Sequence, residues 1–176
     1  MNFSAIKFND IANGQGIRTT LFISGCSHHC KGCHNPQTWN ENNGQLFDEK
    51  IKEKIFNEFE KYYISGLTLS GGDPLYCNNL NDVYNLVTEF KKKYPDKTIW
   101  IYSGYTWEEI CEENCSVLEE HFIMRQAILS QCDVFVDGRY NEELKDITLK
   151  WRGSSNQRVI DIKKSIKEGK VILYCD

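Results

Sequence analysis

The stretch that decides the fold is "TTLFISGCSHHCKGC", residues 19–33, where an apolar run passes directly into a loop with three cysteines. The run "TTLFIS" (19–24) has the length and apolar content of a buried strand. The loop then places Cys26, Cys30 and Cys33 in the spacing C-x3-C-x2-C. A buried strand that ends in a cluster of thiols predicts an α/β protein with reactive groups at the end of a strand.

The composition is that of an ordinary globular domain. The chain has 176 residues, of which 40% are hydrophobic and 26% charged, and its net charge is −4. This balance gives no basic surface for nucleic acid or an anionic membrane, and no apolar run approaches the roughly 18 residues of a spanning helix. The N-terminus has no apolar segment of the signal-peptide type. We therefore expect one cytoplasmic domain, residues 1–176, that binds neither nucleic acid nor membrane.

Eight cysteines are many for a chain expected in a reducing compartment. An even count indicates disulfides in small secreted proteins, whereas clustered cysteines in this setting indicate metal binding or catalysis. We assign no role to Cys77, Cys132 and Cys175, because scattered cysteines are usually small buried hydrophobic residues. Cys111 and Cys115 lie one turn apart on an expected helix, and we interpret them as helix-face thiols rather than a second metal site.

Apolar periodicity predicts strands that alternate with helices along the chain. Pro95 ends one expected helix, and Thr106 with Glu109 forms a capping box that begins another. The expected strands are 19–24, 66–70, 98–103, 133–136 and 170–174, and the expected helices are 48–63 with Asp48 as N-cap, 80–94, 106 onward and 118–130. Such alternation predicts a parallel sheet with right-handed crossovers.

The unusual motifs follow the ends of these strands. Cys26 follows the first strand, Gly71–Gly72 the second, Ser103–Gly104 the third and Asp137–Gly138 the fourth. Parallel α/β folds place their sites at the carboxyl ends of the strands. We therefore expect these four loops to build one site.

Three thiolates on one loop favour an iron–sulfur cluster over zinc. Structural zinc sites are four-coordinate and usually take their ligands as two separated pairs, and His34, adjacent to Cys33, is badly placed to complete one. In a cluster each thiolate binds a different iron, so three cysteines leave one iron of a four-iron cube open to a small molecule. We expect His28 and His29 to be loop residues without a ligand role. Zinc stays open as the alternative.

The second motif is "LSGGDPL" (69–75). Adjacent glycines allow close backbone approach, and Pro74 stiffens the exit from the loop. The stretch has no Gly-Lys-Ser/Thr and is not a phosphate-binding loop. By itself it is equally well explained as a plain strand-to-helix turn.

Together, the two motifs resemble the radical S-adenosylmethionine (SAM) superfamily. The resemblance implies an α/β fold with a parallel sheet in a partial (β/α) barrel, and a 4Fe-4S cluster held by Cys26, Cys30 and Cys33. It also implies that the open iron binds SAM, and that the reduced cluster splits SAM into methionine and a 5′-deoxyadenosyl radical. No catalytic side chain is then expected, because the radical forms on SAM.

The same resemblance implies which residues contact SAM. The backbone of the superfamily's Gly-Gly-Glu motif binds the SAM amino group, which implies this role for Gly72 and Asp73, with aspartate in place of glutamate. We expect Gly72→Val to impair SAM binding more than it impairs folding, and iron content to survive. Gly32, Cys33 and His34 are expected beside SAM and the cluster. Most members carry an aromatic residue where this chain has Gly32, which resembles the small glycyl-radical activating proteins.

Five stretches, in order and over nearly the whole chain, extend the resemblance to the anaerobic ribonucleoside-triphosphate reductase activating proteins. The five stretches are "NGQGIRTTLFISGC" (13–26), "CHNPQTW" (33–39), "LSGGDPL" (69–75), "VDGRY" (136–140) and "WRGSSNQRVID" (151–161). The last stretch is the most specific to that family, and the first two are shared with the longer pyruvate formate-lyase activating enzyme.

This resemblance implies a radical SAM oxidoreductase that activates a partner enzyme. The adenosyl radical takes a hydrogen from a glycine near the C-terminus of the reductase and leaves a glycyl radical there. A low-potential donor such as flavodoxin or ferredoxin supplies the electron. Two interpretations stay open, namely another small radical SAM enzyme acting on a metabolite, such as a deazaguanine synthase, and a zinc-stabilised binding module. In the last of the five stretches, Arg152 and Arg158 are available to bind a carboxylate. The alternative interpretation is that this stretch is a solvated loop without a binding role.

Overall fold

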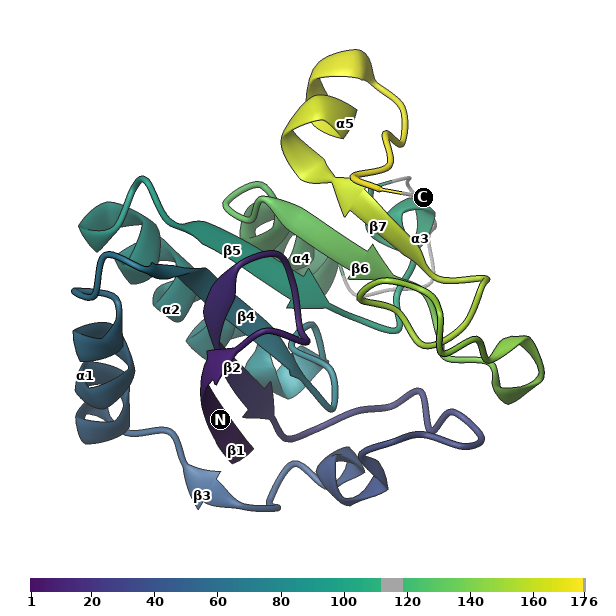
Figure 1. The fold of residues 1–176 in the computed structure, drawn as a ribbon. Helices are drawn as coiled ribbons and strands as arrows, with labels where there is room; N and C mark the ends of the chain where they lie inside the picture. The colour runs from purple at the N-terminus through teal and green to yellow at the C-terminus, as the bar shows by residue number, and fades with distance from the viewer. Residues whose placement is uncertain (112–118, 176) are drawn as a thin grey trace.

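A seven-stranded sheet runs through the computed structural model, which describes residues 1–111 and 119–175 (Figure 1). The strands are β1 (Asn2–Asp10), β2 (Ile17–Ile23), β3 (Gln45–Leu46), β4 (Ile64–Gly71), β5 (Thr98–Tyr102), β6 (Val134–Asp137) and β7 (Arg158–Asp161). Their order across the sheet is β3-β1-β2-β4-β5-β6-β7. The central strands β2, β4, β5 and β6 are parallel, and β1, β3 and β7 are antiparallel to their neighbours.

Most of the helices cover one face of this sheet (Figure 1). The helices are α1 (Glu49–Glu58), α2 (Leu80–Lys93), α3 (Trp107–Cys111), α4 (Glu119–Leu129) and α5 (Ile162–Glu168). Figure 1 shows α2 and α4 behind the parallel strands, whereas α5 lies beyond β7 at the edge of the sheet. Within the described residues, no helix is both long enough and apolar enough to cross a membrane.

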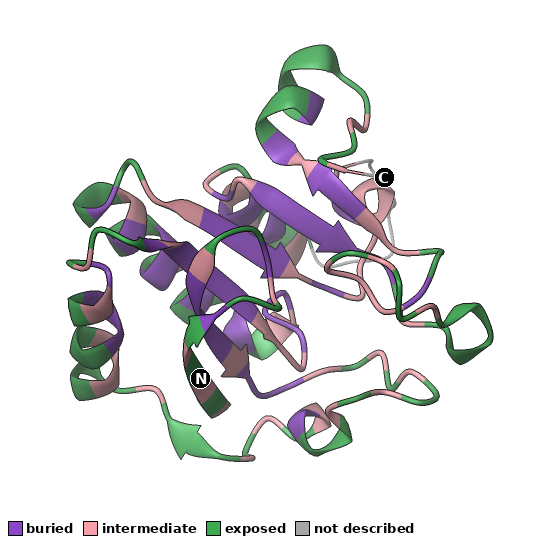
Figure 2. Ribbon diagram, viewed as in Figure 1, coloured by how far each residue is buried: buried purple, intermediate pink, exposed green. Residues whose placement is uncertain are grey.

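The two faces of each strand carry different side chains, because successive residues point to opposite sides. In β5, Ile99 and Ile101 belong to the large core under the helices, and Trp100 belongs to a smaller cluster on the other face, against which Tyr102 packs. Figure 2 shows that burial is concentrated along the central strands. The smaller cluster comprises Trp100, Val134, Val136 and Val159.

The helix starts confirm the predicted caps. Asp48 precedes α1, and its Oδ1 accepts a hydrogen bond from Ile51 N–H at 2.9 Å. Before α3, Thr106 N–H donates to Glu109 Oε2 at 2.8 Å, and Glu109 N–H donates to Thr106 Oγ1 at 3.2 Å. These contacts satisfy backbone donors that have no partner inside a helix.

The two ends of the chain correct the sequence prediction. The first strand, β1, was not predicted, because half-exposed and polar residues interrupt its apolar alternation. The strand expected at 170–174 is wrong, since that segment makes only an isolated bridge between Leu173 and Ile160. The last strand is β7, antiparallel to β6. The sheet is therefore mixed, with only its central strands parallel.

Candidate functional site

The carboxyl ends of the four parallel strands meet at a cavity of about 410 Å³. Each strand contributes its following loop, through Cys26 after β2, Gly72 at the end of β4, Ser103 after β5 and Gly138 after β6. The structure thus brings together four loops that are far apart in the sequence.

The cavity lies on the face of the sheet that α2 and α4 leave uncovered. Phe22 of β2, Tyr102 of β5 and Val136 of β6 line it, whereas their strand neighbours Ile101 and Phe135 pack into the core under the helices. Alternation along the strands therefore separates the cavity from the helix-side core.

The cysteine loop is held by backbone hydrogen bonds to the short turn Pro36–Trp39. Gly25 N–H donates to Thr38 O at 2.7 Å, and Cys26 N–H donates to Trp39 O at 3.2 Å. Gly25 has a φ of 104°, in the region that favours glycine. The loop consequently folds back toward its own strand.

Cys26, Cys30 and Cys33 all line the cavity and are partly buried. Burial raises the pKa of the Cys26 thiol to about 11 and also raises the pKa of Cys30. Asn35 N–H donates to Cys33 Sγ at 3.4 Å. In the described part of the chain, no group of three or more His, Cys, Asp or Glu side chains surrounds a single ion position. The donor set fits a cluster, which takes each thiolate on a different iron.

The carboxylate of Asp73 connects three of the loops. Nε2 of His28 lies 2.7 Å from Asp73 Oδ2, and the same oxygen accepts hydrogen bonds from Ser103 Oγ at 2.9 Å and Gly104 N–H at 3.1 Å. The other oxygen accepts from Leu75 N–H at 2.8 Å. Asp73 is 1% exposed and is not among the residues that line the cavity. Its side chain therefore holds the loops together from a buried position outside the cavity lining.

His28 lies in the cysteine loop, as expected, but its side chain is buried there. Its side chain is 5% exposed, and the Tyr105 ring packs edge-on against it with centroids 4.6 Å apart. A Cβ on Gly104 would lie 2.3 Å from the imidazole, so glycine is needed there for this packing. His29 is exposed and contacts the Trp39 ring at 4.7 Å.

Gly72 allows the cysteine loop to approach β4. Its N–H donates to Ile23 O at 2.7 Å, and Asp73 N–H donates to Gly25 O at 2.8 Å. A Cβ on Gly72 would lie 2.6 Å from Gly25 O and 2.7 Å from Thr38 O. A substitution there must therefore displace neighbouring backbone, which argues against the expectation that iron content survives it.

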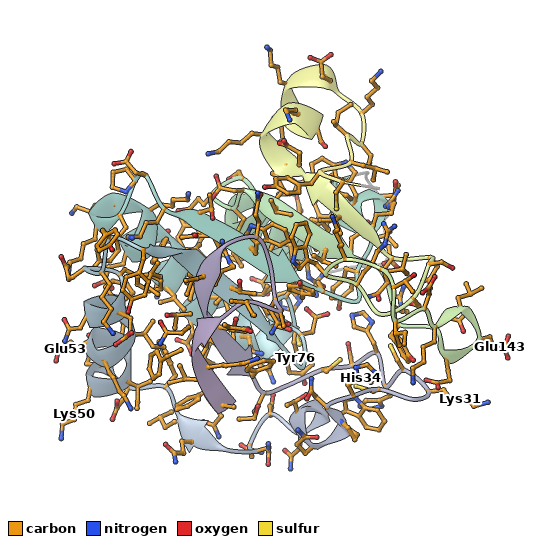
Figure 3. All side chains as sticks on the ribbon, viewed as in Figure 1. Lys31, His34, Lys50, Glu53, Tyr76 and Glu143 are labelled. Atoms are coloured by element: carbon orange, nitrogen blue, oxygen red, sulfur yellow. The ribbon has the colours of Figure 1, made fainter. Side chains whose placement is uncertain are left out.

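Gly32 and His34 have different positions relative to the cavity. Gly32 is exposed, has a φ of 74° and is not part of the lining, and a Cβ there would meet the Glu142 carboxylate. His34, labelled in Figure 3, lines the cavity. Its ring packs against Tyr140 with centroids 5.4 Å apart. Of the residues expected beside SAM, Cys33, His34 and Gly72 line the cavity, and Gly32 and Asp73 do not.

The stretch 151–158 is an ordered loop rather than a solvated one. Gln157 Oε1 accepts hydrogen bonds from Gly153 N–H at 3.0 Å and Ser154 N–H at 3.2 Å, and Gln157 Nε2 donates to Gly138 O at 2.9 Å. One amide side chain thus ties this loop to the end of β6.

The two arginines of this loop differ in availability. Arg158 donates to Asp137 Oδ1 at 3.0 Å and to Glu108 Oε1 at 2.9 Å, and these bonds raise its pKa. It is therefore occupied inside the protein, and the expectation that it is available to an external carboxylate is wrong. Arg152 lines the cavity.

The other described cysteines do not line the cavity. Cys132 is fully buried in the helix-side core, and Cys111 ends α3 and packs at the edge of the same core. Cys77 and Cys175 are partly buried. Cys115 lies outside the described residues, so the expected pairing with Cys111 on one helix face stays a prediction.

A family model described as a 4Fe-4S single cluster domain matches residues 12–160. Relatives named anaerobic ribonucleoside-triphosphate reductase-activating protein cover most of the chain. The relative from enterobacteria phage T4 is 43% identical over 90% of this chain and 93% of its own length. Those from Haemophilus influenzae and Escherichia coli are each 40% identical, over 89% and 90% of this chain and 96% and 97% of their own lengths. The chain belongs to the anaerobic ribonucleoside-triphosphate reductase-activating protein family.

Membership of the activating-protein family settles the class of metal site. The match to a 4Fe-4S domain includes the whole cysteine loop, so the chain is an iron–sulfur activating enzyme rather than a zinc-stabilised binding module. Sequence reasoning gave no role in the cavity to three side chains that line it, namely His28, Tyr102 and Tyr140. The position of His28 inside the cysteine motif was the available signal.

Proposed function

We propose that this protein is a radical SAM activase that generates a glycyl radical on an anaerobic ribonucleoside-triphosphate reductase. The observation that carries the proposal is the cavity in which the three-cysteine loop faces the Gly-Gly-Asp loop, in a chain of the activating-protein family. Cys26, Cys30 and Cys33 would hold a 4Fe-4S cluster, which would supply one electron for the cleavage of SAM to methionine and a 5′-deoxyadenosyl radical. Transfer of a hydrogen atom from a reductase glycine would then give 5′-deoxyadenosine and the glycyl radical.

Cys26, Cys30 and Cys33 are the proposed cluster ligands. Cluster binding requires thiolates, so the thiol protons are released when the metal binds. Burial opposes this release, because it raises the pKa of the Cys26 and Cys30 thiols. The backbone N–H of Asn35 donates a hydrogen bond to Cys33 Sγ. Hydrogen bonds to cluster sulfurs are also a means of setting the reduction potential.

The chain's part in SAM binding is to shape the cavity beside the cysteines. Cys33, His34 and Gly72 line it and are the proposed neighbours of SAM. Gly32 and Asp73 act less directly: Gly32 through the turn between two cysteines, and Asp73 through the hydrogen bonds that place His28. We propose no catalytic side chain.

The proposed substrate is a peptide segment of the reductase that carries a glycine near its C-terminus. The cavity lies on the uncovered face of the sheet, so a segment of a large partner can reach it without passing through the helix-side core. The remaining parts of the proposal are a flavodoxin or ferredoxin as electron donor, a cytoplasmic location, and one radical SAM domain over residues 1–176 with a partial (β/α) barrel. Its four parallel strands would form the barrel segment.

The decisive test is the product on the partner. The reconstituted protein is mixed without oxygen with the reductase, SAM and a reductant, and electron paramagnetic resonance is recorded. We expect a glycyl-radical signal that disappears when SAM is omitted or when Cys30→Ala replaces the wild type. A protein that holds its cluster and cleaves SAM, yet gives no radical on the reductase, would refute the assigned substrate and favour a metabolite as substrate.

A further inference from the structure

Two buried polar atoms among the residues that line the cavity have no hydrogen-bond partner in the described structure. They are Oη of Tyr102 and Nε of Arg152. Buried polar groups are nearly always paired, and an unpaired donor costs stability. Both side chains line the cavity, so a ligand with acceptor oxygens there can supply the missing partners once these side chains turn toward it.

Arg152 differs from the other four arginines of the sequence, which are all satisfied inside the protein. Arg139 and Arg158 form ion pairs, and Arg18 and Arg125 each donate at least two hydrogen bonds to neighbouring oxygens. Arg152 donates one long hydrogen bond, from Nη1 to Gln157 O at 3.3 Å. Within the described residues, no carboxylate forms an ion pair with it.

The backbone on both sides of Arg152 is fixed. Trp151 has a φ of 59°, which is costly for a bulky residue, and its ring packs edge-on against Trp100 with centroids 4.9 Å apart. On the other side, Gly153 N–H donates to Gln157 Oε1. Backbone strain that the surrounding packing maintains is concentrated at ligand-binding sites.

A short series of contacts connects Arg152 to the cysteine loop. A Cβ on Gly153 would lie 3.1 Å from the Tyr140 ring, so this glycine packs directly against tyrosine. The Tyr140 ring packs against His34, which follows Cys33 in the sequence. The rings of Tyr140 and His34 therefore lie between the Arg152 segment and the cysteine motif, and Arg152 lines the same cavity as the cysteines.

We propose that the Arg152 guanidinium binds the carboxylate of SAM. The inference rests on the proposed function, which places SAM in this cavity. A guanidinium keeps its charge at all working pH values, and its planar set of donors matches a carboxylate. An acidic side chain of the partner peptide is the other source of a carboxylate at this position, and the experiment separates the two.

The test compares two ligands that differ only in the carboxylate. S-adenosylhomocysteine carries it, and decarboxylated S-adenosylhomocysteine lacks it but keeps the amino group. Both are titrated calorimetrically into the anaerobically reconstituted wild type and into Arg152→Gln, Arg152→Lys and Lys150→Gln. Lys150 is exposed and is not part of the cavity lining, so its variant controls for the lost charge.

We expect Arg152→Gln to weaken S-adenosylhomocysteine binding by about tenfold or more and to leave the decarboxylated ligand within about twofold. The affinity of Arg152→Lys for S-adenosylhomocysteine should lie between those of the wild type and Arg152→Gln, and the affinity of Lys150→Gln should match that of the wild type. Unchanged S-adenosylhomocysteine binding in Arg152→Gln would overturn the inference, and weaker binding to the reductase in that variant would then assign the carboxylate to the partner. An equal loss for both ligands would also overturn it. A wild type that binds neither ligand refutes the proposed function itself.

Discussion

His28 and Asp73 lie 45 positions apart in the sequence, yet His28 Nε2 is 2.7 Å from Asp73 Oδ2. His28 belongs to the cysteine loop after β2, and Asp73 belongs to the Gly-Gly-Asp loop after β4. The same carboxylate oxygen accepts from Ser103 and Gly104, after β5. Contacts within the protein thus set the position of the cysteine loop against the strand ends.

Asp73→Asn should loosen this arrangement. The amide can still accept from Leu75 N–H through Oδ1, but its NH₂ group then faces His28 and the Gly104 N–H in place of an acceptor. Leaving a buried donor unpaired costs about 1–3 kcal/mol. We expect a lower free energy of unfolding in denaturant titrations of the metal-free protein, and faster loss of iron to a chelator.

Ser103→Ala is the matched control for Asp73→Asn. It removes one donor to the carboxylate and the acceptor of the Tyr105 N–H, and it leaves the His28 contact in place. Its effect on iron loss should therefore be smaller. Equal iron retention in Asp73→Asn and the wild type would show that the carboxylate does not hold the cysteine loop.

Gly72→Ala tests how closely the two loops approach. The added Cβ would lie under 3 Å from two backbone carbonyl oxygens, which cannot move aside as a side chain can. Overpacking of this kind costs about 1–3 kcal/mol, and the backbone of the cysteine loop has to move to relieve it. We expect both the free energy of unfolding and the iron content after reconstitution to fall.

Gly153→Ala provides the comparison for Gly72→Ala. Its added Cβ would meet the Tyr140 ring at 3.1 Å, a contact that a small movement of a side chain relieves. Iron content should therefore stay near that of the wild type. If Gly72→Ala retains its iron as well as Gly153→Ala does, the close approach of the loops tolerates a methyl group.

The sequence could predict the central architecture because local signals there agree with the tertiary structure. The parallel strands carry apolar residues at the positions that pack into the helix-side core. The caps at Asp48 and Thr106 are set by residues within the same turn. The cysteine motif likewise carries its chemistry in its spacing. For these parts, periodicity and motif were sufficient.

The remaining parts depend on contacts that no local pattern encodes. β1 has polar residues at positions that its antiparallel partner β2 nevertheless pairs. β7 is four residues long and follows a polar loop, so the more apolar segment at 170–174 was a stronger local signal for a strand. The burial of His28 depends on Asp73 and Tyr105, both far along the chain.

Each of Cys26, Cys30 and Cys33 should be required for the cluster. Replacing any of them with alanine leaves an iron without its protein ligand. We expect anaerobically reconstituted variants to lose most of their iron and their absorbance near 400 nm. Cys77→Ala is the control, because Cys77 does not line the cavity. Normal iron content in any of the three variants would remove that cysteine from the ligand set.

Arg158→Gln should destabilise the junction of α3 with β6 and β7. It leaves Asp137, which is 1% exposed, with the hydrogen bond from Trp107 N–H but without its cation. Breaking a fully buried pair costs about 3–5 kcal/mol, and because Arg158 is partly exposed we expect about 2 kcal/mol in the free energy of unfolding.

Arg139→Gln is the matched control for Arg158→Gln. Its pair with Glu109 has both side chains exposed by more than a third, so its loss should cost about 1 kcal/mol at most. Denaturant unfolding of the two variants under the same conditions measures the difference. Similar costs would mean that the Arg158–Asp137 pair stabilises the protein no more than the exposed Arg139–Glu109 pair does.

The stability of the protein in acid should depend on Asp10, at the end of β1. Burial raises the pKa of this carboxyl, but hydrogen bonds from Thr20, Asn13 and Ala12 outweigh burial and lower the pKa to about 2. In the unfolded chain the pKa of Asp is about 3.9. Because the folded state holds the charged form more strongly, the contribution is present above about pH 4 and is lost as the pH falls through about 2.

Thr20→Val removes one of these hydrogen bonds and should raise the pKa of Asp10 toward its unfolded value. The free energy of unfolding of the variant should then be lower than that of the wild type at pH 6, and it should fall less steeply between pH 4 and pH 2. Other carboxyl groups titrate in the same range in both proteins, so the difference between the two curves isolates Asp10. Denaturant unfolding at several pH values measures both curves. Parallel curves would show that the Thr20 hydroxyl does not stabilise the Asp10 carboxylate.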